Sequence, residues 1–221
     1  MRSSSKRTAA RAFAFSLAVF AAIPASASGP KCVADPVPGW SGSGKRPEPE
    51  NLVSPLLRDA GDDELVARLV YAESLASRCL DLYSGEAGLM DALTEGIART
   101  ILNHVRRVAP KGKDARSVVF GVRQYRSTFG TCDCAKRREF LCPDGASPLW
   151  KASVSAVGRA KAAPDAALRG VEHYFFPRHY DESVNCRRWK GVSPDWLDPK
   201  REVRMPKAAP SLEKCSPFYR L

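Results

Sequence analysis

Residues 64–74 constrain this fold most strongly, because their apolar side chains recur with the period of an α-helix. At roughly 100° per residue, Leu65 and Leu69 lie on one face, which must be buried against other elements. Glu73 falls at roughly 80° from Leu65, inside that apolar face. A purely structural helix would carry an apolar residue there. The sequence therefore predicts a helix that ends at about Ser77 with a carboxylate on its buried side.

The position of Glu73 indicates acid–base chemistry. A carboxyl group held against apolar side chains is partly desolvated, which favours its protonated form. A neutral glutamic acid near neutral pH is the proton donor that cleavage of a glycosidic bond requires. The alternative is a structural glutamate that reaches past the stripe to solvent or pairs with a buried arginine, and periodicity alone favours it. The other charges of this helix, Glu64 and Arg68, are predicted to point away from the stripe.

The first 27 residues predict a secretory signal peptide. Basic residues precede an apolar run over 12–22, and Ala25-Ser26-Ala27 has the small residues of a cleavage site. The apolar run is too short for a stable membrane anchor, so we expect a soluble protein exported to the periplasm or the extracellular space. Cleavage would change the net charge from +11 to +7, with 31 basic and 24 acidic residues left. That charge favours an anionic partner, and the compartment favours a cell-wall polymer over nucleic acid.

Cysteines predict disulfide bonds, because an exported protein folds in an oxidising compartment. All seven lie beyond the predicted cleavage site: Cys32, Cys79, Cys132, Cys134, Cys142, Cys186 and Cys215. The odd number leaves one thiol free or shared between chains. We expect Cys32 to pin a Pro- and Gly-rich arm or linker, residues 28–60, to the domain. Cys186 and Cys215 are expected to hold the tail.

Residues 61–221 predict one mainly helical (α+β) domain with a small β element and disulfide-stapled loops. A broad apolar face over residues 89–108 predicts a second, central helix. His104 lies near this face, where a hydrogen-bonded core histidine is favoured over a catalytic one. The other segments are predicted as a short helical or extended piece at 115–120, a helix from Ser147-Pro148 and a strand at 171–176. Loops are predicted at 78–88 and 127–146, and residues 178–221 are predicted to be mostly loop.

Two other kinds of site compete with an acid at Glu73. A nucleophilic thiol would pair a cysteine such as Cys79 with His173, His104 or His179, but no cysteine lies in a recognisable nucleophile motif. A metal site is the weakest option, because the three histidines lack the spacing that places two ligands on one helix face. We expect no metal and no cofactor.

Four ordered segments match the motifs of one enzyme family. Residues 66–73 resemble a V-V-Y-A-E opening, 96–105 an A-x-x-I-L-N-R-V helix, 117–127 a V-V-x-x-x-x-Q-F-S segment, and 170–175 with Trp189 a closing G-A-x-x-Y-F … W. The family is that of the cell-wall hydrolases that include the spore cortex-lytic enzyme SleB. The resemblance covers about residues 65–190 and leaves out a Cys- and Pro-rich tail.

A second resemblance also involves Glu73. Glu73-Ser74, followed by Gly88-Leu89-Met90, is similar to the first two motifs of lysozyme-like lytic transglycosylases. The chain departs from the first family at His104, where an arginine is usual, and by an extra residue after Gln124. The tail that neither resemblance covers is residues 191–221.

These resemblances imply a lysozyme-like fold and an exported glycosidase that acts on peptidoglycan glycan strands. Glu73 would protonate the oxygen between MurNAc and GlcNAc. In a lytic transglycosylase the MurNAc 6-hydroxyl then attacks C1 and the same glutamate takes back the proton. Glycan binding is implied for Gln124, Tyr125, Tyr174 and Trp189. Two alternatives remain: a non-catalytic wall-binding protein on the same fold, and a Cys/His peptidoglycan peptidase or amidase.

Overall fold

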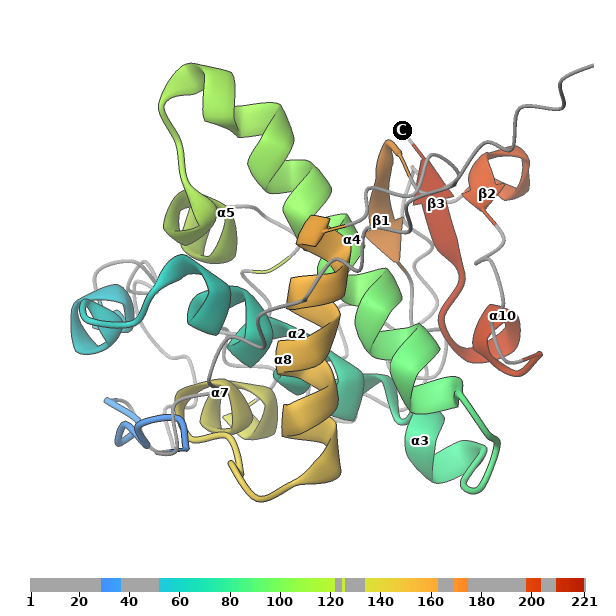
Figure 1. The fold of residues 1–221 in the computed structure, drawn as a ribbon, viewed down its shortest axis with the longest axis horizontal. Helices are drawn as coiled ribbons and strands as arrows, with labels where there is room; N and C mark the ends of the chain where they lie inside the picture. The colour runs from blue at the N-terminus through green and yellow to red at the C-terminus, as the bar shows by residue number, and fades with distance from the viewer. Residues whose placement is uncertain are drawn as a thin grey trace, which may run out of the picture.

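The computed structural model describes residues 29–36, 52–121, 125, 134–162, 169–174, 198–203 and 210–220. In these ranges the chain is mainly helical, with one small sheet beside the helices (Figure 1). The predicted class, mainly α with a small β element, is confirmed. Likeness to the lysozyme fold stays a prediction.

Regular elements follow in this order: η1 (Ser54–Leu57), α2 (Asp62–Ser77), α3 (Cys79–Leu82), α4 (Leu89–Val108), η2 (Ala109–Lys111), α5 (Ala115–Gly121), α7 (Cys134–Leu141), α8 (Pro148–Ala162), β1 (Val171–Tyr174), η6 (Pro199–Arg201), β2 (Glu202–Val203), α10 (Leu212–Cys215) and β3 (Phe218–Arg220). The predicted helices α2, α4 and α8 are confirmed, and the segment at 115–120 is helical. The short helix α3 lies where a loop was predicted.

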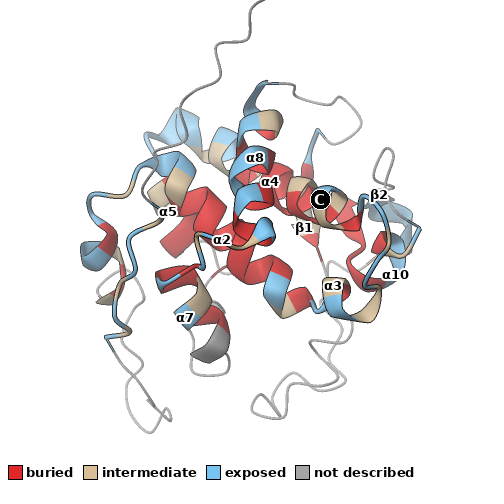
Figure 2. Cartoon of the chain, turned by 60° about the horizontal axis from the view of Figure 1, so that its bottom comes forward, coloured by how far each residue is buried: buried red, intermediate tan, exposed pale blue. Residues whose placement is uncertain are grey.

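Helix α2 is the most completely buried element. Every residue from Leu65 to Ser74 is buried, because α4, α5, α7 and α8 all pack on this helix (Figure 2). Helix α4, which was predicted to be central, keeps an exposed side that includes Asp91 and Arg106. Arg68 was predicted to point away from the apolar stripe, and the face of α2 on which it lies is also covered, so its side chain is fully buried. Carbonyl groups of two other segments cover that face of α2 and bind the guanidinium.

Helix α7 lies where the sequence predicted a loop over 127–146. Of its residues with described side chains, the apolar ones are Phe140 and Leu141, both at its C-terminal end. No apolar period runs through such a segment, so the local pattern does not predict a helix. Contacts with α2 hold it instead, and they bury Lys136 and Arg137.

The small sheet has the strand order β1-β3-β2, and both pairings are antiparallel. Tyr174 of β1 lies opposite Phe218 of β3. The predicted strand is confirmed over Val171–Tyr174, and its last two predicted residues lie outside the described ranges. Strands β2 and β3 and helix α10 are short elements within residues 178–221, which were predicted to be mostly loop. Such short strands form because β3 has a partner on each side.

Two disulfide bonds join distant parts of the chain. Cys32 pairs with Cys142, which confirms that the arm is pinned to the domain. Cys79 of α3 pairs with Cys215 of α10. The side chains of Cys132, Cys134 and Cys186 lie outside the described part of the chain.

Among the described residues, no helix combines the length and apolar character needed to span a membrane.

Gly96 lets the sheet approach α4 closely, which gives a first testable prediction. A Cβ at this position would lie 2.8 Å from Cε1 of Phe218 and closer still to Cζ of the same ring. We expect Gly96→Ala to displace β3 and to lower the free energy of unfolding by about 1–3 kcal/mol. The matched control is Gly158→Ala on α8, where a Cβ meets nothing within 4 Å. This change should raise stability by about 0.5–1 kcal/mol in urea denaturation. Equal effects of the two changes would contradict the close approach.

Candidate active site

Glu73 is buried and forms an ion pair across two helices. Its side chain is 3% exposed, and Nζ of Lys136 on α7 lies 2.7 Å from its Oε1. The lysine side chain is 4% exposed, so both charges are removed from water. The burial predicted from the periodicity of α2 is confirmed, and the alternative of a glutamate that reaches solvent is excluded. The partner identified is a lysine, whereas the structural alternative had named an arginine.

This ion pair changes the expected chemistry of Glu73. An ammonium group at hydrogen-bond distance makes a charge-assisted hydrogen bond with a carboxylate. Proton donation requires the neutral acid. An acid mechanism at Glu73 must therefore include Lys136, which the sequence prediction left out.

Tyr125 lies within the electrostatic reach of Glu73. It is fully buried, and burial raises the pKa of its phenol well above the usual value, with further increases from the charges of Glu73 and Glu172. Its ring meets His104 edge-on at 5.6 Å and stacks with Tyr174 at 6.5 Å between centroids. Tyr125 therefore connects the region of Glu73 to helix α4 and strand β1.

Helix α4 holds strand β1 through two neighbouring side chains. Nδ2 of Asn103 donates a hydrogen bond to the carbonyl oxygen of Val171 at 2.8 Å. Nε2 of His104 lies 2.7 Å from the carbonyl oxygen of Glu172, and the guanidinium of Arg107 lies 2.8 Å from Nδ1. These contacts assign the tautomer with the proton on Nε2, because a carbonyl accepts and a guanidinium donates. The predicted role of His104 as a hydrogen-bonded core histidine is confirmed, and the contacts position β1.

The structure brings three of the predicted site residues into one region. Glu73, Tyr125 and Tyr174 come from α2, from the segment after α5 and from β1, and the two tyrosines are 0% and 6% exposed. Gln124 and Trp189 lie outside the described residues. Contact of either tyrosine with a glycan stays a prediction.

Lys136 is the residue of this region that the sequence did not reveal. The local sign was a run of three basic residues, Lys136-Arg137-Arg138, followed closely by Phe140 and Leu141 in a cysteine-bounded segment. Basic runs are usually solvated, so the pattern does not distinguish a buried lysine from an exposed one. The pairing required the fold, because α2 and α7 are distant in the chain.

The competing kinds of site receive less support. Cys79 is bonded to Cys215 and therefore has no thiol to act as a nucleophile. Within the described ranges, no group of three or more His, Cys, Asp or Glu side chains is arranged to hold a metal ion.

The raised pKa of Tyr125 predicts a specific loss of stability in alkali. The unfolded chain releases this proton at a pH of about 10, whereas the folded protein retains it. Stability is therefore intact below that pH and falls as the pH rises toward the folded-state pKa, by on the order of 1 kcal/mol per pH unit. Tyr125→Phe should reduce this fall, as measured by urea denaturation at pH values between about 8 and 11.

Tyr219→Phe is the matched control for this measurement. Burial of Tyr219 also raises the pKa of its phenol, but the shift is smaller. We expect a smaller improvement in alkali from this change. An unchanged pH dependence in Tyr125→Phe would contradict a buried neutral phenol beside Glu73.

No protein-family model, curated protein or solved structure matches this chain. The resemblance to the SleB family therefore rests on the quoted motifs alone. The class that the fold and the site define is a mainly helical, disulfide-bonded protein with a buried glutamate–lysine pair.

Proposed function

We propose that this chain is an exported peptidoglycan glycosidase that cleaves the MurNAc–GlcNAc bond through Glu73, as a lytic transglycosylase. The observation that carries the proposal is the convergence of the four motif segments. Glu73, Asn103, Tyr125 and Tyr174 each come from a different one of them, and they lie in one continuous region. If these segments only packed against one another, an apolar side chain would serve at position 73 as well as a carboxylate does.

Proton transfer in this mechanism uses one carboxyl group twice. Glu73 donates its proton to the glycosidic oxygen, the bond to C1 breaks, and an oxocarbenium-like centre forms. The 6-hydroxyl of MurNAc attacks C1 and returns its proton to Glu73, which leaves a 1,6-anhydro end. Between these steps Glu73 is a carboxylate, and this is the form that pairs with Lys136. The ammonium would stabilise the charge that develops as the proton leaves.

One observation favours a second candidate, a wall-binding protein without catalysis. The ion pair of Glu73 with Lys136 satisfies the buried carboxylate without any substrate. A protein that had lost catalysis could keep such a pair for stability alone. The two candidates differ in whether covalent products appear.

Mass spectrometry of the products from purified peptidoglycan tests the proposal. The purified protein, without residues 1–27, is incubated with intact sacculi, and the soluble fragments are analysed. Muropeptides with 1,6-anhydro ends support the lytic transglycosylase, and reducing ends would correct it to a hydrolase. Binding to sacculi without release of fragments would favour the second candidate, and cleaved peptide bonds would contradict both.

A further inference from the structure

The arm was predicted over residues 28–60, and its first described part, residues 29–36 (hereafter the arm), is bound to the end of helix α7. Cys32 is bonded to Cys142, directly after the helix. The amide of Val33 donates a hydrogen bond to the carbonyl oxygen of Leu141 at 3.0 Å. The arm therefore has both a covalent and a backbone attachment at the same point.

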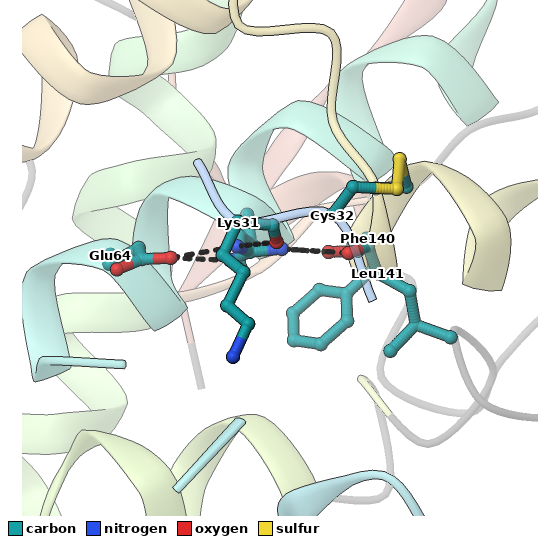
Figure 3. Close-up of a disulfide and its surroundings, with 7 residues drawn as sticks. Lys31, Cys32, Glu64, Phe140 and Leu141 are labelled. Atoms are coloured by element: carbon teal, nitrogen blue, oxygen red, sulfur yellow. Dashed lines mark hydrogen bonds and ion pairs between the residues drawn. A yellow bond between two sulfur atoms is a disulfide. The ribbon is translucent and has the colours of Figure 1, made fainter. Parts of the chain in front are cut away.

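Arg68 joins the arm to α7 and to α2. Figure 3 shows the labelled Glu64, Lys31, Phe140 and Leu141 gathered at this point, beside the disulfide of Cys32. Its Nη1 donates to the carbonyl oxygens of Phe140 and Leu141 at 3.1 and 3.0 Å, and its Nη2 donates to that of Lys31 at 2.6 Å. Its Nε donates to Glu64 at 2.9 Å. The last carbonyls of a helix have no partner within the helix, so a buried guanidinium is a strong way to satisfy them. One side chain of α2 thus fixes the C-terminal end of α7.

Two neighbouring buried cations attach α7 on different sides. Lys136 pairs with Glu73 of α2, and Arg137 pairs with Asp35 of the arm through contacts of 2.8–3.0 Å. The side chains of the two cations are 4% and 1% exposed. A shift of α7 would disturb both pairs at once, because the two residues are adjacent in one helix.

From this arrangement we propose that Lys136 is a positioning residue for Glu73, and that the arm, closed by the Cys32–Cys142 disulfide, holds α7 so that Lys136 reaches Glu73. The role assigned to Lys136 in turnover rests on the proposed function of Glu73. Lys136 fixes the orientation of the carboxylate and stabilises its charge after proton donation. Because the disulfide forms in an oxidising compartment, the site is completed by export.

Acylation of lysines tests the role of the arm without any assay of activity. The folded protein is treated with a limiting amount of acetic anhydride, and modification of each lysine is measured by peptide mass spectrometry. Lys136 is expected to react at least about 10-fold more slowly than Lys151, which is exposed on α8, because buried lysines are shielded. This protection should be lost in Cys32→Ser/Cys142→Ser and kept in the matched control Cys79→Ser/Cys215→Ser.

Circular dichroism establishes that each variant is folded before it is labelled. If Cys32→Ser/Cys142→Ser does not fold, Asp35→Asn takes its place, because it keeps the disulfide and removes the anion that binds Arg137. Equal protection of Lys136 in the arm variant and in the control would overturn the role of the arm.

Kinetics on soluble glycan strands test the role of Lys136 in turnover. Lys136→Met should lower kcat by on the order of 100-fold and change KM by less than about threefold, because the lost interaction acts on charge that develops during reaction. Lys136→Arg should recover at least about 10-fold of that loss, since it restores a cation. An unchanged kcat, or a change confined to KM, would overturn the positioning role. A wild-type protein without cleavage would refute the proposed function, whereas the acylation result would still decide the role of the arm.

Discussion

Glu73→Gln is expected to lower the release of soluble muropeptides from purified cell walls by a factor on the order of 1,000, because an amide has no proton to donate at neutral pH. General acid catalysis contributes roughly 100- to 10,000-fold to an enzymatic rate. In the proposed mechanism Glu73 gives up the proton and takes it back, so its loss should affect both halves of the reaction. The effect should appear in kcat, with little change in binding to sacculi.

Stability must be measured beside activity, because the same change breaks a buried ion pair. Glu73→Gln leaves Lys136 buried without its partner anion, at a cost of about 3–5 kcal/mol. The double variant Glu73→Gln/Lys136→Met removes both charges, so it should recover much of that stability and stay inactive. Recovery of folding without activity would separate the catalytic effect from unfolding.

An acid on the surface of the same helix supplies the control. Asp63 lies in the first turn of α2, is 62% exposed and pairs with Lys161. Asp63→Asn should leave the release of muropeptides unchanged. If Glu73→Gln and Asp63→Asn both remained active, the catalytic assignment would fail, and the buried pair would be structural.

Arg68→Met is expected to lower the free energy of unfolding by about 3–5 kcal/mol, which is the largest stability effect that we predict for a single side chain outside the candidate site. The guanidinium is fully buried and donates to three carbonyl groups and to Glu64. Methionine fills a similar volume but cannot donate to those carbonyls or to Glu64. The transition midpoint in urea should fall with little change in slope.

Lys161→Met is the matched control, because it also replaces a cation by methionine. Lys161 lies on α8, and its side chain is 51% exposed in its pair with Asp63. Exposed ion pairs contribute about 0–1 kcal/mol, so the midpoint should hardly move. If both changes lowered the midpoint equally, Arg68 would not hold the arm and α7 together.

Elements that were predicted correctly have local signals. Helix α4 follows from apolar residues that recur every four positions, and α8 follows from Ser147 and Pro148, with the Ser147 hydroxyl accepting from the amide of Leu149. Strand β1 follows from a β-branched and aromatic run. Each signal lies within a few residues of the element that it predicts.

Elements that were missed depend on partners elsewhere in the chain. Strand β3 is three residues long and forms because it pairs with β1 and β2. Helix α7 has two buried basic residues and no apolar period, so its stability comes from Glu73, Asp35 and Arg68. Neither set of contacts leaves a periodic pattern within the segment itself.

The sequence by itself determined that Glu73 lies on a helix with its side chain turned inward, because helical periodicity depends on residues within one or two turns. Tertiary structure alone decided what meets that side chain. Lys136 reaches Glu73, and Cys32 pairs with Cys142, only when segments far apart in the chain are packed together. The charge state of a buried carboxylate is set by those distant neighbours, so its chemistry could be anticipated only in part from the helix that carries it.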